Sequence, residues 1–316
     1  MSEAHISVSG VEPIMEIRQT EPLFHIDLAA IGDNFRTLRA RYSGRDLSAV
    51  VKSDAYGLGL ERVARSLAAA GCKTFWVNDL DEAVRLRVAV PNAKVYVLFG
   101  LGLHSPANFA GTGTIPVLAS LQEVELCSEF AARSDRHFPV AIQLDTGLGR
   151  LGLIQSDVDR LVENSGLLEP LAVDCWISHL AAFNVPDDPM NEVQRRLLLD
   201  WTGRLPAAPI SLTSSSGLFM GDDWHFDIAR AGSALFGVQT SVRWQDGLKP
   251  CYRLTAPILR VAELPAGNRI GYHGMTALER NSSIATIALG YGNGLPERSA
   301  VRGTSHFRRV REPVVA

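Results

Sequence analysis

Short β-branched runs alternate with amphipathic stretches along most of this chain, and the alternation restricts its fold more than any other feature. Helical patterns cover Ile31–Arg41, Leu60–Ala70, Leu80–Val88, Leu121–Arg133, Asp157–Asn164 and Asn191–Arg204, with Asp27 or Asn34 in the first turns of the first helix. The expected strands are Ala49–Lys52, Thr74–Asn78, Lys94–Phe99, Ile115–Ala119, Val140–Asp145, Val173–His179, Ile210–Thr213 and Phe226–Arg230. Strands and helices in alternation form parallel βαβ units, and eight such strands indicate an α/β fold, a (β/α)8 TIM-like barrel.

The pattern changes after Gly237, where strands follow one another with no helix between them. We expect these strands over Cys251–Glu263, Asn268–Met275 and Ser282–Ala288. The predicted organisation is an N-terminal segment (1–22), a barrel (23–244) and a mainly β C-terminal domain (245–316). This last domain is short and breaks off as Pro313–Val315 starts what reads as another strand, so we expect it to be incomplete.

Composition limits the possible partners and the compartment. The 316 residues are 46% hydrophobic and 21% charged, with a net charge of −3, which gives no reason to expect nucleic acid or an anionic membrane as a partner. Any anion must therefore be held by a local site. The chain has no apolar run of membrane-spanning length and no signal-peptide core at its start, so we predict a cytoplasmic protein. The four cysteines are far apart, which argues against a disulfide framework and against a metal site; they are Cys72, Cys127, Cys175 and Cys251.

Lys52 is the first candidate functional residue. It ends the apolar run of the first barrel strand and precedes a Gly-containing turn. Burial of its amine would lower the pKa and free the nucleophile for a Schiff base with an aldehyde cofactor. The plain alternative is a lysine whose head reaches water at the strand end. The segment alone does not decide between them.

Other polar residues follow the ends of later strands, where barrels carry their function. A Gly-rich turn delivers Arg150, and His179 ends the sixth strand. Hydroxyl and Gly residues, typical of a phosphate-binding loop, follow the last two strands at Ser214–Gly217 and Arg230–Ser233. Individually, the serines could be helix caps, His179 a core histidine, and Arg230 an ion-pair partner of Asp227. Together the five strand ends point to pyridoxal phosphate.

These residues also carry a family resemblance. Val51–Gly57 resembles the cofactor-lysine motif of the alanine racemases, which are barrel-type pyridoxal-phosphate enzymes. Leu144–Gly152 and Phe226–Gly232 resemble their mid-barrel and last-strand motifs. Ile270–Tyr272 and Gly290–Gly294 resemble two motifs of their β domain. The match is collinear from about residue 24 to residue 297.

The resemblance implies a role for each matched residue. Lys52 would carry the cofactor and act as one acid/base, and Tyr272 would be the opposite base, reaching into the partner's site of a head-to-tail homodimer. His179 and Arg230 would support Tyr272, with Arg230 also facing the pyridine nitrogen. Arg150 would contact the ring oxygen or the substrate carboxylate. The phosphate would be held by Tyr56, Ser216, Gly232 and Ser233.

The implied reaction is the interconversion of L- and D-alanine, which supplies D-alanine for peptidoglycan; serine or another small amino acid is the other substrate to consider. Gln143 stands where the family often has a carbamylated lysine, and it cannot supply that group's negative charge. Because the β domain reads as incomplete, a pyridoxal-phosphate-binding homologue without activity is the alternative. A Schiff-base aldolase without cofactor is disfavoured by the Ser and Gly loops and by Arg230.

Overall fold

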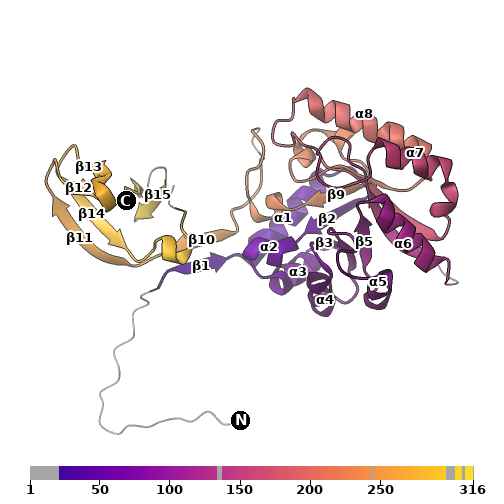
Figure 1. Cartoon of the computed structure of the whole chain (residues 1–316). Coiled ribbons are helices and arrows are strands. Elements are labelled where there is room, and N and C mark those ends of the chain that lie inside the picture. Colours follow the sequence, from indigo (N-terminus) through magenta and orange to yellow (C-terminus); the bar gives the residue numbers. More distant parts are fainter. Residues whose placement is uncertain (1–20, 134–136, 243–244, 297–302, 308–309, 316) are drawn as a thin grey trace, which may run out of the picture. The chain divides into compact units, whose positions relative to one another are not determined.

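The computed structural model describes residues 21–133, 137–242, 245–296, 303–307 and 310–315 (Figure 1). The chain divides into two compact units. One is Ile26–Tyr252, and the other is formed by the described parts of residues 1–25 and 253–316. The predicted boundary between residues 244 and 245 stays a prediction, and most of the predicted N-terminal segment (1–22) lies outside the described residues.

The larger unit is built on a parallel sheet of eight strands. In spatial order they are β8 (Ile210–Ser211), β7 (Leu171–Ile177), β6 (Phe138–Gln143), β5 (Ile115–Leu118), β4 (Lys94–Val97), β3 (Thr74–Val77), β2 (Asp46–Val50) and β9 (Ile228–Ala231). Backbone bonds then join the two ends of this order: Asp227 N donates to Ile210 O at 3.1 Å, and Arg230 N donates to Thr213 O at 2.9 Å. The sheet therefore closes into the barrel that the alternation predicted.

Helices surround the strands (Figure 1). The α-helices are α1 (Leu28–Arg41), α2 (Lys52–Gly57), α3 (Leu60–Ala69), α4 (Leu80–Ala89), α5 (Pro106–Thr112), α6 (Leu121–Ala131), α7 (Gln155–Glu163) and α8 (Pro189–Arg204). Short 3₁₀ turns follow at η1 (Ser165–Leu167), η2 (Gly217–Phe219), η3 (Asp222–Trp224) and η4 (Ser233–Phe236). Side-chain caps start several helices: Asp27 accepts from Ala30 N, Asp79 from Glu82 N and Ser120 from Glu123 N. Asp27, one of the two residues predicted for the start of the first helix, is its N-cap.

The core has two parts. A large cluster fills the space between strands and helices. The buried residues of the smaller cluster all lie on strands of the barrel. In this inner cluster the Trp76 and Tyr96 rings stack at 3.9 Å, and Trp76 Nε1 donates to Ser48 Oγ at 2.7 Å. Because aromatic side chains plug the barrel interior, any cavity must lie at one end of it.

The second unit is a set of short strand pairs. One pair is β1 (Leu23–Ile26) with β10 (Tyr252–Thr255). Three further pairs are antiparallel: β11 (Ile258–Leu264) with β14 (Ser282–Ile287), β12 (Arg269–Ile270) with β13 (Thr276–Ala277), and β15 (Thr304–Phe307) with β16 (Val310–Pro313). Two 3₁₀ turns complete it, η5 (Tyr272–Gly274) and η6 (Tyr291–Asn293). The mainly β C-terminal domain is thereby confirmed, although most of its strand residues are exposed.

Several predicted elements differ in detail. Lys52 does not end a strand, since β2 stops at Val50 and Lys52 begins α2. The strand expected over Cys251–Glu263 is interrupted before Ile258, where Pro257 lacks an N–H to donate. The strand expected over Asn268–Met275 is a hairpin that turns through η5. Helix α5 was missed because it is short and contains glycine; its clearest signal is the capping pair Ser105 and Asn108.

The described residues hold no helix long and apolar enough to cross a membrane. In the same part of the chain, no group of three or more His, Cys, Asp or Glu side chains could hold a metal ion. The four cysteines are free thiols and all are buried.

Asn34 gives a test of how the barrel is fastened. Its fully buried amide donates to Leu235 O (3.0 Å) and Lys249 O (2.8 Å) and accepts from Lys249 N (2.7 Å). Asn34→Ala leaves a buried carbonyl and two partly buried backbone groups without these partners, so we expect a loss of about 2–4 kcal/mol in the free energy of unfolding. Urea unfolding followed by tryptophan fluorescence measures it. The neighbouring Asp33→Ala removes only exposed ion pairs and should stay close to wild type; equal losses in both variants would contradict the assignment.

Candidate functional site

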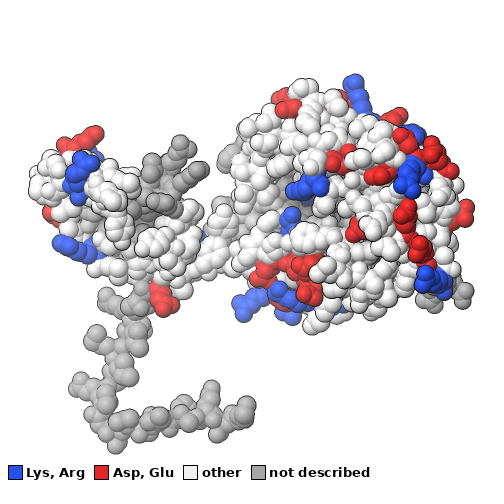
Figure 2. All heavy atoms as spheres, viewed as in Figure 1, with Lys and Arg blue, Asp and Glu red and all other residues white. Residues whose placement is uncertain are grey.

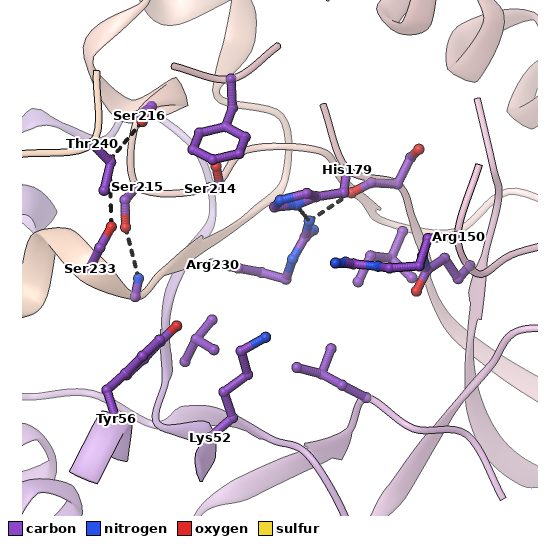
Figure 3. Close-up of a pocket in the computed structure, with 17 residues that line it drawn as sticks. Lys52, Tyr56, Arg150, His179, Ser214, Ser215, Ser216, Arg230, Ser233 and Thr240 are labelled. Carbon is purple, nitrogen blue, oxygen red and sulfur yellow. Dashed lines mark hydrogen bonds between the residues drawn. The ribbon is translucent and has the colours of Figure 1, made fainter. Parts of the chain in front are cut away.

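A cavity of about 400 Å³ opens where the barrel strands end (Figure 3). Every barrel residue that the sequence predicted for the site lines it. The lining residues are Val50, Lys52, Tyr56, Leu98, Gln143, Arg150, Ile177, Ser178, His179, Phe183, Ser214, Ser215, Ser216, Arg230, Gly232, Ser233 and Thr240. The carboxyl ends of parallel strands meet at one face, which explains why residues as far apart in sequence as Val50 and Thr240 come together.

Lys52 and Tyr56 enter the cavity from α2, whose backbone between these two residues is a strained left-handed turn. The residues Ser53, Asp54, Ala55 and Tyr56 all have φ between 53° and 57°, in the left-handed helical region. Non-glycine residues rarely adopt this conformation, which costs about 1–2 kcal/mol per residue. Such strain persists only where the surroundings impose it, and it often marks functional sites. Its effect here is that both Lys52 and Tyr56 point into the cavity from one short segment (Figure 3).

The Lys52 amine lies in surroundings that favour its neutral form. Burial lowers the pKa of Lys52, the cation of Arg150 lowers it further, and the carboxylate of Glu82 acts in the opposite direction. The half-buried amine is thus a better nucleophile than an exposed lysine. Of the two interpretations of Lys52, a solvated strand end and a reactive amine, the cavity favours the second.

Arg230 crosses the far wall of the cavity beside His179 (Figure 3). Its guanidinium donates to Ser211 O (2.7 Å), Ser178 O (2.6 Å) and Nδ1 of His179 (3.3 Å). Burial lowers the pKa of Arg230 to about 10, so the group stays charged near neutral pH. No ion pair joins it to Asp227 in the described structure; the Asp227 carboxylate accepts from Ile210 N instead. The ion-pair interpretation of Arg230 is therefore wrong.

His179 is held as a neutral imidazole. Burial, followed by the nearby cations of Arg230, Arg150 and Lys52, lowers the pKa of His179 to about 3. Because Nδ1 accepts from Arg230, a proton on the ring must sit on Nε2. His179 can therefore pass the influence of the Arg230 cation to a group bonded at Nε2 without becoming charged itself.

A loop after β6 carries Arg150 to the cavity. Asp145 Oδ1 accepts from the backbone N–H groups of Gly147, Leu148 and Gly149 at 2.9–3.0 Å, which fixes the start of the loop. Gln143 fixes its end by donating from Nε2 to Leu151 O at 2.8 Å. Gln143 thus supports the loop that presents Arg150 through a neutral hydrogen bond.

Hydroxyl groups gather on the side of the cavity opposite Arg150 (Figure 3). Thr240 Oγ1 lies 2.9 Å from Ser216 Oγ and 3.5 Å from Ser233 Oγ. Ser215 Oγ accepts from the backbone of Gly232 at 2.9 Å and of Ala234 at 3.2 Å, and so ties the two loops together. Sequence reasoning missed the role of Thr240, because no strand end or turn motif marks its position.

Gly232 leaves space that a side chain would fill. A Cβ atom at this position would lie 2.6 Å from the Tyr56 hydroxyl and 3.5 Å from Val50. Burial raises the pKa of Tyr56 to about 12, so its hydroxyl remains a hydrogen-bond donor. Small residues, hydroxyl donors and exposed backbone at one place suit a phosphate or another compact anion.

Tyr272 is the predicted site residue that does not line this cavity. It lies in the second compact unit, where it begins η5 after Gly271, and it is 78% exposed. The described structure of a single chain thus gathers the barrel residues and leaves Tyr272 on a surface.

The cavity lining combines three cationic side chains, one of them a lysine with a lowered pKa, with a cluster of hydroxyls and no described Asp or Glu. Acidic and basic side chains are interspersed over the face of the barrel unit shown in Figure 2, so this face carries no broad surface of one charge. Fold and site together define a (β/α)8 barrel protein with a reactive amine in an anion-binding mouth.

Comparison with known proteins identifies the family. The model for "Alanine racemase, N-terminal domain" matches residues 26–240, and that for "Alanine racemase, C-terminal domain" matches residues 251–316. The alanine racemase of Brucella abortus is 36% identical over 304 residues, covering 92% of this chain and 77% of the relative. That of Acidiphilium cryptum is 37% identical over 295 residues, covering 93% and 82%.

Solved structures agree. The crystal structure of alanine racemase from Bartonella henselae with covalently bound pyridoxal phosphate matches with a TM-score of 0.87 and 32% identity, covering 93% of this chain and 82% of that one. The chain belongs to the alanine racemase family, and the resemblance and the fold class drawn from the sequence are confirmed.

The neutral state of His179 has a consequence for stability in acid. Its pKa is about 3 in the folded protein, against an ordinary value of 6.5, so the unfolded chain binds more protons between these values. Stability contributed by the neutral imidazole is present above about pH 6.5 and is lost as the pH falls toward 3. Glutamine at position 179 cannot titrate, so His179→Gln should lose less stability than the wild type between about pH 6.5 and about pH 4. The slopes of the free energy of unfolding against pH should differ by the equivalent of up to roughly one bound proton. Urea unfolding of cofactor-free protein across this range tests it, and parallel curves would contradict the buried neutral histidine.

Proposed function

We propose that this protein is a pyridoxal-phosphate-dependent alanine racemase that uses Lys52 and Tyr272 as its two acid/base groups. The observation that carries the proposal is the cavity itself. In a member of the alanine racemase family, it joins a lysine of lowered pKa, the Arg230–His179 pair and a hydroxyl-lined anion pocket. The cofactor named for the Bartonella henselae relative suits each of these parts.

The residues present fit pyridoxal 5′-phosphate. Tyr56, Ser216, Ser233 and Thr240 would donate hydrogen bonds to the phosphate in the space that Gly232 leaves open. Lys52 would bind the aldehyde carbon, and Arg230 would face the pyridine nitrogen as a permanently charged donor. When bound, the cofactor withdraws electrons from the α-carbon of an amino acid and so makes its proton removable. A charged Arg230 would disfavour protonation of the ring nitrogen, which would limit this withdrawal and suit a racemase.

Two groups must act on opposite faces of the α-carbon, because racemisation removes a proton from one face and returns one to the other. Lys52 would serve one face, since burial lowers the pKa of its amine and so makes the amine easier to deprotonate than that of an exposed lysine. Tyr272 would serve the other face. Its phenol would be oriented by His179, whose neutral ring can bond it at Nε2 while Arg230 holds Nδ1.

The proposal includes a head-to-tail homodimer in which Tyr272 enters the partner subunit's site. Two features of the second unit support it. Tyr272 is largely exposed in the single chain, and large apolar residues of β11, Ile258, Leu259 and Val261, are exposed as well. Apolar surface of this kind marks sites where another chain packs.

Arg150 would bind the substrate carboxylate or the ring oxygen of the cofactor, with alanine as the substrate. Gln143 would support the Arg150 loop through a neutral hydrogen bond to Leu151 O, in place of the charged carbamylated lysine that the family often has. We therefore expect a small change in how Arg150 is oriented, without loss of function. We place the reaction in the cytoplasm, as a supply of D-alanine for cell-wall peptidoglycan.

Substituting each of the two proposed bases in turn separates cofactor binding from catalysis. The wild type should show a visible absorption band with pyridoxal phosphate, lose it on borohydride reduction and convert L- to D-alanine. Lys52→Ala should lose both the band and the activity. Tyr272→Phe should keep the band and lose activity by about 10²–10⁴-fold, the usual contribution of a general acid/base. A wild-type band without racemisation would indicate a cofactor-binding protein that is not a racemase.

Gly232 tests the phosphate pocket. Gly232→Ala would place its Cβ 2.6 Å from the Tyr56 hydroxyl, so we expect the dissociation constant for pyridoxal phosphate to rise by about 10–100-fold. The control is Gly203→Ala on α8, where no atom apart from the chain neighbours and the helix's own backbone lies within 4 Å of the new Cβ, and binding should be unchanged. Equilibrium titration of cofactor-free protein measures both constants. Unchanged affinity in Gly232→Ala would place the phosphate elsewhere.

A further inference from the structure

The left-handed turn between Lys52 and Tyr56 needs support from outside itself. Within the turn only Ala55 is fully buried, while Ser53 and Tyr56 are exposed by residue area, so packing alone does not hold it. Besides the bonds inside α2, its backbone bonds join the turn to its own flanks: Ala55 N donates to Val51 O at 2.9 Å, Leu58 N to Ala55 O at 3.2 Å, and Gly59 N to Asp54 O at 2.9 Å. A strained segment that presents a reactive amine requires a firmer attachment.

Glu82 on α4 supplies that attachment. Its carboxylate is buried, with the residue only 8% exposed, and each oxygen accepts a backbone N–H. Oε1 accepts from Asp54 N at 2.7 Å, and Oε2 accepts from Asn78 N, just after β3, at 2.9 Å. One charged group thus bridges the middle of the turn and the end of a barrel strand. Hydrogen bonds to an ionised acceptor are stronger than neutral ones.

Two further contacts surround this bridge. Asn78 Nδ2 donates to Ser53 Oγ at 2.9 Å, which adds a second link from the end of β3 to the turn. On the outside, Arg85 bonds Asp54 at 2.6 Å, but both side chains are about 45% exposed, and exposed ion pairs contribute little. The buried Glu82 carboxylate is therefore the main fastening of the turn.

Glu82 also balances the charge around the Lys52 amine. The described cavity lining contains the cations Lys52, Arg150 and Arg230 and no carboxylate. Glu82 lies behind the turn and raises the pKa of Lys52, against the lowering effects of burial and Arg150. Glu82 therefore acts on the Lys52 amine in two ways: its hydrogen bonds hold the backbone of the turn, and its negative charge raises the pKa of the amine.

We propose that Glu82 is a positioning residue for Lys52: by bonding Asp54 N and Asn78 N it holds the left-handed turn that directs the lysine amine and the Tyr56 hydroxyl into the cavity. The proposal rests on the proposed function, in which Lys52 binds an aldehyde. A carboxylate that only stabilised α4 would have no specific effect on that reaction.

The chain contains a matched control. Glu123 is the third residue of α6, as Glu82 is of α4, and its oxygens accept from Leu101 N (2.8 Å) and Ala119 N (2.7 Å). It performs the same bridging task after β5, next to a loop that carries no cavity lysine. Glu82→Gln and Glu123→Gln each replace one acceptor oxygen by an NH₂ that faces an N–H, so both lose the same type of bridge, at a buried residue for Glu82 and at a partly buried one for Glu123.

The experiment compares Glu82→Gln, Glu123→Gln and the wild type in three measurements on the cofactor-free full chain. The first is the dissociation constant for pyridoxal phosphate. The second is the labelling of Lys52 by pyridoxal and borohydride, followed by mass spectrometry; pyridoxal lacks the phosphate, so this reports on the lysine alone. The third is amide hydrogen exchange over residues 53–58.

We expect Glu82→Gln to raise the dissociation constant for pyridoxal phosphate by about tenfold or more and to slow labelling of Lys52 by a similar factor. It should also speed amide hydrogen exchange in the turn. Glu123→Gln should match the wild type in all three measurements while also losing thermal stability. Equal effects in the two variants, or none in Glu82→Gln, would overturn the proposal while leaving the proposed function intact. Failure of the wild type itself to form an adduct at Lys52 would overturn the proposed function and this proposal with it.

If Glu82→Gln fails to fold, Glu82→Asp replaces it. This variant keeps the carboxylate but shortens its side chain by one methylene, so it cannot reach both Asp54 N and Asn78 N. It should weaken pyridoxal phosphate binding and speed exchange in the turn by a smaller factor, a few-fold. Wild-type values in both measurements would overturn the proposal.

Discussion

The hydrogen bonds of the buried Arg230 are the interactions on which barrel and site both depend. The backbone N–H of Arg230 donates to Thr213 O where the sheet closes, and its guanidinium donates to carbonyls at the ends of β7 and β8. A buried cation with no carboxylate partner among the described residues must satisfy its donors with neutral acceptors. Those acceptors are the strand-end carbonyls and His179, so the same bonds hold three strand ends together and keep the histidine neutral.

The rest of the mouth follows from this positive charge. Arg150 adds a second cation, and burial, followed by this cation, lowers the pKa of Lys52 and favours its neutral amine. An anion is then needed to balance the site, and the hydroxyls of Ser216, Ser233 and Thr240 lie ready to bind one. Negative charge is supplied from behind by Glu82, which also fastens the strained turn. Charge balance and backbone geometry are thus set by the same few residues.

Prediction from the sequence succeeded where chemistry and position coincide. The period of the strands predicted the barrel, and the rule that barrels carry function at strand ends selected Lys52, Arg150, His179 and Arg230, all of which line one cavity. It failed where a conformation opposes local preference. Nothing in Ser53–Tyr56 favours four successive left-handed residues, so Lys52 was expected to end a strand.

The sequence by itself determined the class of fold, the family and the types of chemical group at the mouth of the barrel, because periodicity and motif spacing are local properties of the chain. Only the tertiary structure decided the roles of Glu82, Thr240 and Ser215. Their partners are distant in sequence: Glu82 bonds Asp54, Thr240 bonds Ser216, and Ser215 bonds Gly232. Hydrogen bonds between remote segments depend on how the closed ring brings loops together, and no local pattern encodes them.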